Sequence, residues 1–590
     1  MSKVRDEICA HEAVLNEPTT IRGDWRRIDR LIIRYWAEAV VVAIALLLWA
    51  PRLTGPIDLR WDGGVYYLLG TSLATGHGYR ILSEPGSPEA LEYPPLLPVV
   101  VAVHEWALGT TNPDVVALWL RKSYFVIFVA YALAVLALAR RYLRPWLALA
   151  ATTLCLLHLY TIFLSDLLYA ELPFALVSVV FALVVASGLP ASRPWLRETT
   201  SFALAAAGFL LRTAGVVLFA AWVLEALIRR RWRLGLVRGA LALLPVIAWQ
   251  GDVARVHGSY EYTHPAYEYQ RALYQNYNVT YAENIRLLDP FRPERGLVDA
   301  AALAERMKTN FAEMPAALGY AVSTNAEFWS RALQRAQYRL LGRAVLPLRV
   351  VSAPIFGFAV LVIAGLVVLI RRGAWLMVFI VLGSVGLICL APWPEQFWRY
   401  LMPIVPFLTI AAVLASERFE AALRGSIWTT ALARTILAGL LVLAFTVQVY
   451  AALWLFGQRA GAEGATFVPG GSSAAARFFY HNNSWRAWEQ AAAWTGAHAV
   501  PGEIVATIAP HQLYLQTGLR AVYPPMDADP VRARGLLEAV PVSYVIVDKL
   551  RYRDFSRRYA RPAVESDPVG WRLVWSFHGT QIYERSTGRP

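Results

Sequence analysis

Long apolar blocks are the feature that most limits how this chain can fold. The segments AEAVVVAIALLLWA (37–50), FALVSVVFALVVASGL (174–189) and IFGFAVLVIAGLVVLI (355–370) each approach the roughly 20 apolar residues that span a bilayer. Hydrophobic residues make up 57% of the chain and charged residues only 17%. The sequence therefore predicts an α-helical, polytopic membrane protein. The polar first residues argue against a cleavable signal peptide, so we expect the first apolar block to stay as an anchor.

The net charge of +14 has a simple explanation in such a protein. Much of the basic excess falls in short loops between apolar blocks, where it indicates orientation and not nucleic-acid binding. The segment IRGDWRRIDRLIIR (21–34) predicts a cytoplasmic N-terminal tail, residues 1–32. Counting from there, we expect about 11 spans, at 33–52, 116–138, 146–164, 172–189, 201–228 (two spans), 235–254, 349–371, 375–391, 400–416 and 430–456.

The block Ser201–Ile228 is the ambiguous part of this topology. It is long for one span and short for two, and basic clusters flank it on both sides. A hairpin of two short helices keeps both clusters in the cytoplasm and puts Arg212 at the external tip. A single span would instead bury that arginine in lipid, at a cost of roughly 2.5–3.5 kcal/mol. We therefore predict the hairpin.

This topology gives a transmembrane domain over 33–456 with two long external loops, 53–115 and 255–347, and a C-terminal domain over 457–590. The tail alternates strand-like segments such as EIVATI and SYVIVDK with helix-like segments such as WRAWEQAAAWTG. This pattern predicts a small extracytoplasmic α/β domain. It contains no G-x-G-x-x-G, Walker A or G-x-S-x-G motif, so a structural or acceptor-binding role is expected.

The topology also gathers several polar residues on the external face, and each has an ordinary alternative. Asp62 could cap an amphipathic helix lying in the membrane interface, and Asp58 could be a plain loop residue. Asp166 and Glu171 could mark a solvated helix end, and Arg399, which follows Glu395, could simply snorkel to the interface. Arg212, with apolar neighbours on both sides, favours a functional role.

As a set, these residues suit a reaction on a lipid phosphate. Arginine binds phosphate through a rigid fork of donors. A carboxylate can accept the proton of an attacking hydroxyl. A phosphate leaving group needs charge stabilisation and not a proton, so one base suffices.

Short stretches around these residues resemble the bacterial GT-C glycosyltransferases, which include protein O-mannosyltransferases and the aminoarabinose lipid A transferase. They are the first-loop acidic residue with its tyrosines, GHGY, YPPLLP (93–98), LLRTAGVVLF, RYLMPIVP and the tail segment WRAWEQAAAWTGAHAVPGEIVATI. The resemblance implies interfacial helices in the first external loop, a cavity open to the outer face and lipid, a polyprenyl-phosphate sugar donor and inversion at the anomeric carbon. The acceptor would be a hydroxyl of a lipid, glycan or protein, and the location would be the bacterial inner membrane.

Carried over residue by residue, the resemblance implies that Asp62 is the general base and Asp166 the second catalytic acidic residue. Arg212 and Arg399 would hold the donor phosphate, and the substrate would contact Tyr66, Tyr67, Tyr93, Glu171 and Glu395. Many relatives have Asp-Glu where this chain has Asp62 followed by Gly63. A divalent metal on Asp62, Asp166 and Glu171 therefore stays an open alternative, which no spacing demands.

Two other functions use the same features. A flippase for lipid-linked saccharides should have repeated halves and broken helices near the membrane centre, whereas the polar residues here gather on one face. An O-antigen ligase-like enzyme should keep its catalytic groups in a very large external loop. The aromatic stretch HGSYEYTHPAYEYQRALYQNYNVTYAEN (257–284) could contact saccharide or merely cover a cavity.

Overall fold

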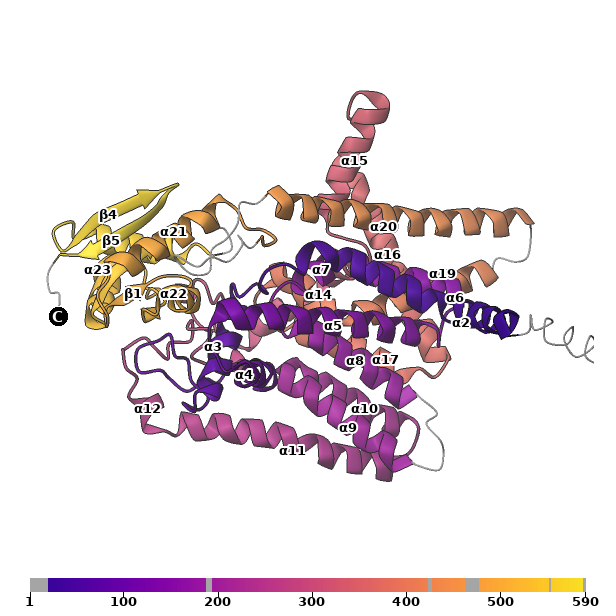
Figure 1. Ribbon diagram of the computed structural model, residues 1–590, viewed down its shortest axis with the longest axis horizontal. Helices are drawn as coiled ribbons and strands as arrows, with labels where there is room; N and C mark the ends of the chain where they lie inside the picture. Colours follow the sequence, from indigo (N-terminus) through magenta and orange to yellow (C-terminus); the bar gives the residue numbers. More distant parts are fainter. Residues whose placement is uncertain (1–19, 187–193, 423–426, 462–476, 551–552, 587–590) are drawn as a thin grey trace, which may run out of the picture.

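The computed structural model describes residues 20–186, 194–422, 427–461, 477–550 and 553–586. It is mostly helical, with a bundle of long helices and a small mixed domain at one end (Figure 1). The first 19 residues of the expected cytoplasmic tail lie outside the described part, as do residues 187–193 of one basic loop. The expected polytopic helical class with a C-terminal sheet domain is confirmed.

Every expected span contains a helix. Six stretches within the described residues are long and apolar enough to cross a membrane, namely Tyr35–Arg52, Pro113–Ala139, Trp232–His257, Arg349–Arg371, Pro394–Phe419 and Thr430–Ala460. The helices of the bundle are α2 (Thr20–Trp49), α5 (Pro113–Ala139), α6 (Pro145–Leu157), α7 (Leu159–Leu164), α8 (Glu171–Ala186), α9 (Pro194–Leu211), α10 (Val216–Ile228), α11 (Trp232–His257), α16 (Ser352–Arg371), α17 (Trp375–Ile388), α18 (Phe397–Leu401), α19 (Val405–Ala422) and α20 (Ile427–Gly461).

The position of a helix in the bundle follows from whether its apolar side chains are buried in the protein or exposed on its surface. The stretch Pro394–Phe419 is almost entirely buried, so α19 is a central helix, and it packs against α16. Helix α11 is peripheral (Figure 1), and Leu243 and Ile247 on it are more than half exposed. Apolar side chains that water would penalise are stable there because lipid surrounds them.

The hairpin predicted for Ser201–Ile228 is present. Helix α9 ends at Leu211, Arg212 stands in an extended conformation before the short turn η2 (Thr213–Gly215), and α10 returns along α9. The segment 146–164 was expected to be one continuous helix. Instead, the helix is interrupted at His158, which separates α6 from α7.

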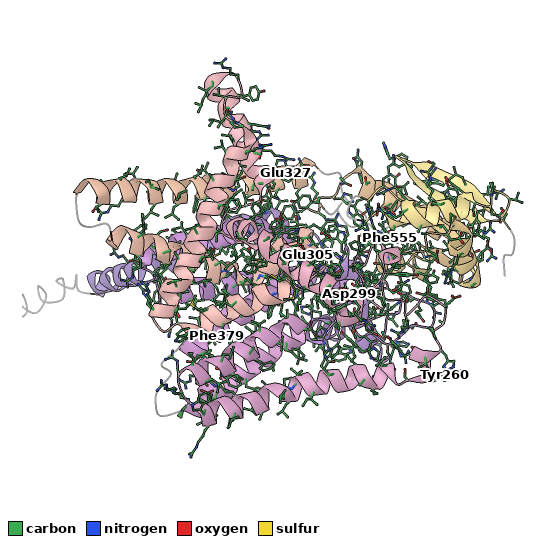
Figure 2. All side chains as sticks on the ribbon, turned by 180° about the vertical axis from the view of Figure 1, so that it is seen from behind. Tyr260, Asp299, Glu305, Glu327, Phe379 and Phe555 are labelled. Carbon is green, nitrogen blue, oxygen red and sulfur yellow. The ribbon has the colours of Figure 1, made fainter. Side chains whose placement is uncertain are left out.

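The two long loops are largely helical. The first contains α3 (Asp62–Ala74) and α4 (Leu96–Leu108), and the second contains α12 (Tyr260–Thr263), α13 (Tyr281–Asn284), α14 (Ala300–Val322) and α15 (Ala326–Leu341). Helix α15 stands out crosswise to the bundle in Figure 1. Seen from behind, Glu327 lies at the base of α15 (Figure 2), where Phe328 and Trp329 are buried.

The C-terminal domain is a five-stranded mixed sheet with order β2-β1-β3-β5-β4, in which β1 pairs in parallel with β2 and β3 while β5 pairs antiparallel with β3 and β4. Alternate residues of β3 enter two hydrophobic clusters, with Tyr544 and Ile546 on one face and Val545 and Val547 on the other. Its elements are α21 (Asn483–His498), β1 (Ile504–Ala506), α22 (Pro510–Thr517), β2 (Ala521–Val522), α23 (Pro530–Ala539), β3 (Val542–Val547), α24 (Arg561–Glu565), β4 (Trp571–Phe577) and β5 (Thr580–Arg585).

Candidate active site

The segment that leads into α3 is fixed by the backbone of a neighbouring loop. The amide of Asp58 donates to the carbonyl of Asp166 at 3.0 Å, and the amide of Leu168 donates to the carbonyl of Asp58 at 3.0 Å. The side chain of Asp58 forms an ion pair with Arg60 at 2.6 Å, and both residues are buried. Asp58 therefore lies in a loop, as expected, and has a structural role there, because it anchors the segment that leads into α3.

Trp61 turns the chain so that α3 begins at the next residue. Its backbone has a φ of +56°, which is uncommon for a residue with a side chain and is typical of functional sites. The indole is held by edge contacts with Trp485 and Phe163 and lies under the guanidinium of Arg60. Contacts from three directions thus keep a strained residue in place directly before Asp62.

Asp62 is the first helical residue of α3 and does not cap it. Trp61 occupies the cap position, and no side chain caps the helix. The carboxylate of Asp62 instead accepts from Arg399 at 2.5 Å and from the hydroxyl of Tyr277 at 3.1 Å. The capping prediction is therefore wrong. Most residues of α3 are buried, with α4 and α22 packed against the helix.

The two glycines after Asp62 allow this close packing. A Cβ atom on Gly63 would lie 3.1 Å from the carbonyl oxygen of Asp58. One on Gly64 would lie 3.2 Å from the carbonyl oxygen of Leu59 and 3.3 Å from the Cβ of His511. A larger residue at position 63 would crowd the loop that anchors α3.

Asp62 belongs to a chain of alternating charges. Arg399 bridges Asp62 and Glu171, and Glu171 in turn forms an ion pair with Arg212. Glu171 is fully buried, and the side chain of Arg399 is only 15% exposed. The structure thus brings together four of the residues singled out in the sequence. Two alternatives are wrong, because Glu171 is not a solvated helix end and Arg399 is an ion-pair bridge that does not snorkel.

Burial and neighbouring cations act in opposite directions on Asp62. Burial alone would raise the pKa of its carboxyl, but the charges of Arg399 and, more weakly, Arg553 outweigh it and leave the pKa below the ordinary value of 3.8. Asp62 is therefore ionised at neutral pH and can accept a hydrogen bond from an incoming hydroxyl group.

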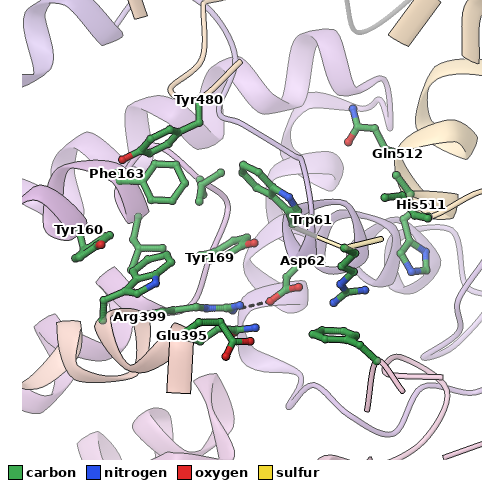
Figure 3. Close-up of a pocket in the computed structure, with 18 of the residues that line it drawn as sticks. Trp61, Asp62, Tyr160, Phe163, Tyr169, Glu395, Arg399, Tyr480, His511 and Gln512 are labelled. Atoms are coloured by element: carbon green, nitrogen blue, oxygen red, sulfur yellow. Dashed lines mark hydrogen bonds and ion pairs between the residues drawn. The ribbon is translucent and has the colours of Figure 1, made fainter. Parts of the chain in front are cut away.

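A cavity of about 580 Å³, the main cavity, opens beside Asp62 (Figure 3). Its wall combines aromatic rings with a few polar groups, as in many small-molecule sites. The bundle, both long loops and the C-terminal domain contribute to its lining. The lining residues are Trp61, Asp62, Tyr160, Phe163, Leu164, Leu167, Tyr169, Tyr277, Phe291, Asn325, Glu327, Glu395, Gln396, Trp398, Arg399, Tyr480, Ile508, Ala509, His511, Gln512, Tyr523 and Arg553.

A second cavity of about 370 Å³, the side cavity, lies at the other end of the charge chain. Arg212 lines it together with Tyr66 and Tyr93, whose rings lie 4.6 Å apart. Most of the remaining lining is apolar and includes Phe174, Val216, Ile388 and Ile404. The lining also contains Glu92, and burial raises the pKa of its carboxyl well above the ordinary value. This cavity can hold an apolar group that carries one anionic end at Arg212.

Asp166 lies in a different environment. Arg121 and Arg459 form ion pairs with it, and Arg52 lies 3.7 Å away; all four residues are buried. These arginines lower the pKa of Asp166 more than its burial raises it. Asp166 lines neither of the two cavities. It joins the ends of α2, α5 and α20 to the loop on which Asp58 is anchored.

The three carboxylates proposed for a metal are therefore not gathered at one point. Within the described residues, no group of three or more His, Cys, Asp or Glu side chains could hold a metal ion. Asp62 and Glu171 already share the cation Arg399. The residues present do not fit a site for a divalent metal.

The other predicted contacts divide between the cavities. Glu395 lines the main cavity and Tyr66 and Tyr93 line the side cavity, whereas Tyr67 lines neither and donates from its hydroxyl to the carbonyl of Thr111 at 2.8 Å. Sequence reasoning missed the contributions of the distant segments, namely Tyr277, His511, Gln512 and Arg553. Of these four residues, only Tyr277 could have been found from the sequence, because it lies in the aromatic stretch 257–284.

Comparison with known proteins supports the fold. No family model matches the chain, and no curated protein sequence matches it significantly. Among solved structures, the chain is similar to the oligosaccharyltransferase AglB of Archaeoglobus fulgidus in complex with an inhibitory peptide and dolichol-phosphate, at 14% identity over 94% of this chain and 75% of that one, with a TM-score of 0.50. The apo form of the oligosaccharyltransferase of that organism gives 13% identity over the same shares and a TM-score of 0.52.

The chain is also similar to ArnT of Cupriavidus metallidurans bound to undecaprenyl phosphate. That likeness has 12% identity, covers 92% of this chain and 97% of that one, and has a TM-score of 0.50. These proteins are GT-C superfamily glycosyltransferases. The chain therefore has the polytopic fold that the short sequence resemblances implied.

Proposed function

We propose that this protein is an inverting glycosyltransferase that moves a sugar from a polyprenyl-phosphate donor to an acceptor hydroxyl. The observation that carries the proposal is the position of Asp62. Its ionised carboxylate lines the main cavity and is linked through Arg399 and Glu171 to Arg212 in the side cavity.

The side cavity suits the lipid end of such a donor. A largely apolar lining beside Arg212, whose side chain is only partly exposed, matches a prenyl chain with a phosphate head. Glu92 in the same lining would be protonated there, because burial raises its pKa, and so would not repel the phosphate. The neighbouring folds support this lipid class, since the structure of AglB contains dolichol-phosphate and that of ArnT contains undecaprenyl phosphate. Arg212 and Arg399 would bind the donor phosphate, while Glu171 would fix their spacing and Tyr66 and Tyr93 would form the wall nearest the headgroup.

Asp62 would act as the base. The acceptor hydroxyl in the main cavity attacks the anomeric carbon, and its proton passes to Asp62. The bond between the anomeric carbon and the phosphate oxygen breaks, and the phosphate leaves with the electron pair. Arg212 and Arg399 stabilise the developing charge. Attack from the side opposite the leaving phosphate inverts the anomeric centre.

Asp166 takes a different role in this proposal from the one first expected. Its three arginines and its position outside both cavities support a positioning role. It would hold the loop that anchors Asp58 and thereby fix the start of α3, where Asp62 lies. Glu395, which lines the main cavity, is kept as a substrate contact.

We place the reaction on the extracytoplasmic face of the bacterial inner membrane, with the N-terminus in the cytoplasm. The basic loops of the sequence support this orientation. The C-terminal domain lies at the same end of the bundle as α3 and away from the start of α2 (Figure 1), so the domain and the site would share the outer side.

The test is transfer of radiolabelled sugar from a panel of polyprenyl-phosphate sugars by purified protein in nanodiscs. Wild-type protein should transfer the sugar or hydrolyse a donor, and Asp62→Asn and Arg212→Ala should lose this turnover while folding normally. Asp252→Asn is the matched control, because Asp252 is an exposed carboxylate in the C-terminal part of α11 and lines neither cavity. Full turnover in Asp62→Asn would refute the base. Movement of lipid-linked sugar across liposomes without any turnover would favour the flippase.

A further inference from the structure

Two adjacent side chains of α22, in the C-terminal domain, line the main cavity without a complete set of partners. His511 is 3% exposed and Gln512 is 4% exposed. Within the described residues, neither Nε2 of His511 nor Oε1 of Gln512 has a hydrogen-bond partner. Buried polar atoms of this kind usually have a partner, because an unpaired one has lost its hydrogen bond to water without replacement. Both residues line the main cavity, and two unpartnered polar groups in one lining indicate a ligand.

His511 presents a neutral ring to that ligand. Its Nδ1 lies 2.7 Å from the hydroxyl of Ser83, and burial lowers its pKa to about 3. The imidazole is therefore uncharged at neutral pH and offers a single donor or acceptor at Nε2. The amide of Gln512 is neutral as well, so these two side chains suit an uncharged polar group. The nearest cation in the lining is Arg553, which donates to the hydroxyl of Tyr523 at 3.2 Å.

The position of the pair relative to the charge chain is fixed by packing. In Figure 3, Asp62 lies between Arg399 on one side and His511 and Gln512 on the other. Helix α22 packs on α3, and Gly64 lets the Cβ of His511 approach the start of α3 closely. If the donor phosphate lies toward Arg399, the pair faces the substrate that approaches Asp62 from the opposite side.

Aromatic rings surround the same part of the cavity. The ring of Tyr277 lies 4.7 Å from that of His511 and stacks on Tyr523 at 5.9 Å. Trp61 lines the cavity too. Rings supply apolar contact area, and neutral donors and acceptors fix orientation. Together they suit a sugar ring, which has apolar faces and hydroxyl groups on its edge.

We infer that His511 and Gln512 form a subsite that binds the hydroxyl groups of a neutral sugar ring on the acceptor. This inference rests on the proposed function and makes it more specific, since it names a glycan or glycolipid as the acceptor. It also gives the C-terminal domain a direct part in acceptor recognition.

The test uses the full-length protein in nanodiscs with radiolabelled hexyl glycosides of glucose, mannose, galactose and N-acetylglucosamine as probes. His511→Phe keeps a ring against Tyr277 and removes Nε2, and Gln512→Met keeps the length of the side chain and removes the amide. The matched control is Gln516→Met. Gln516 is a buried residue one turn further along α22, also has an unpartnered amide nitrogen, and does not line the cavity.

Two readouts separate the subsite from the chemistry. Each subsite variant should raise the KM for the best glycoside about tenfold, which corresponds to one lost hydrogen bond. Hydrolysis of the donor by water should stay within twofold of wild type, and the control should match wild type in both. The inference is overturned if donor hydrolysis falls as much as transfer, or if wild-type protein glycosylates a Ser/Thr peptide and no glycoside.

Direct binding of the labelled glycosides decides the matter when no donor is turned over. In that case the proposed function fails, and the subsite is judged separately. Saturable binding to wild type that is weakened in His511→Phe and unchanged in Gln516→Met would uphold the sugar subsite. Absence of binding, or equal binding to all variants, would overturn it.

Discussion

Asp62 and Asp166 are both buried carboxylates that form ion pairs with arginine. Backbone hydrogen bonds of Asp58 connect the segment before Asp62 to the loop that contains Asp166. The two carboxylates differ in how many arginines surround them and in whether a cavity lies beside them. Asp166 is enclosed by Arg52, Arg121 and Arg459 and borders neither cavity. Asp62 has one close arginine, Arg399, one tyrosine and an open side toward the main cavity. A buried charge is thus a sign of function only where it also reaches space for a substrate.

The largest effect should come from Asp62→Asn. The variant should reduce transfer about 10²–10⁴-fold, the usual contribution of general-base catalysis. Its thermal midpoint should stay close to wild type, because Arg399 keeps its ion pair with Glu171. Transfer assays and fluorescence-detected unfolding in nanodiscs measure the two effects. A large loss of stability, with normal turnover by the protein that remains folded, would show that Asp62 has a structural role like that of Asp166.

Asp166→Asn should show the opposite pattern. It leaves three buried arginines without their shared anion, which should cost about 3–5 kcal/mol of stability. Since the pKa of Asp166 is lowered, its stabilisation is present above the ordinary value of 3.8 and is lost as the pH falls through the lowered value. Yield and thermal midpoint should therefore drop, while protein that folds keeps a wild-type KM. Normal stability with lost turnover would show that Asp166 is a catalytic residue, as the sequence resemblance implied.

Arg212→Gln should raise the KM for the donor about tenfold or more, because a charge-assisted hydrogen bond to phosphate contributes about 1.5–3 kcal/mol. The KM for the acceptor should change less than twofold. Arg229→Gln is the control, since Arg229 is an exposed arginine just beyond the other end of α10. An unchanged donor KM with a reduced kcat would mean that Arg212 acts only in the transition state.

The pH profile tests the pairing of Asp62 with Arg399. Because the pKa of Asp62 lies below 3.8, wild-type turnover should show no acid limb from this group between about pH 5 and 8. In Arg399→Gln the remaining effect of burial should raise the pKa, so an acid limb should move up into this range. The profile of donor hydrolysis measures it. An unchanged profile in the variant would show that Arg399 does not control the ionisation of Asp62.

The smallest effect should come from Tyr67→Phe. It removes one hydrogen bond to the carbonyl of Thr111, which should cost about 1 kcal/mol of stability. Neither KM should change, because Tyr67 lines neither cavity. A raised KM would mean that the first-loop tyrosines act as a pair on the substrate, as the sequence resemblance implied.

Much of the fold could be predicted because it depends on local composition. Apolar blocks of membrane length predicted the helices, and the cost of a buried arginine predicted the hairpin with Arg212 at its turn. The alternating pattern of the tail predicted its strands and helices, including α21, β1 and β3. The break at His158 carried no comparable signal, because the residues on both sides are apolar.

From the sequence alone, one can list the acidic and basic residues that the predicted topology places at helix ends on one side of a membrane. Which of these residues form ion pairs with one another depends on the tertiary structure. Arg399 could be placed on Asp62 only once α18 and α3 were packed, and Asp166 became a scaffold only when three distant arginines converged on it. His511 and Gln512 entered the site through contact between the C-terminal domain and α3. Pairing between charges that are hundreds of residues apart depends on distance and burial, which no local pattern records.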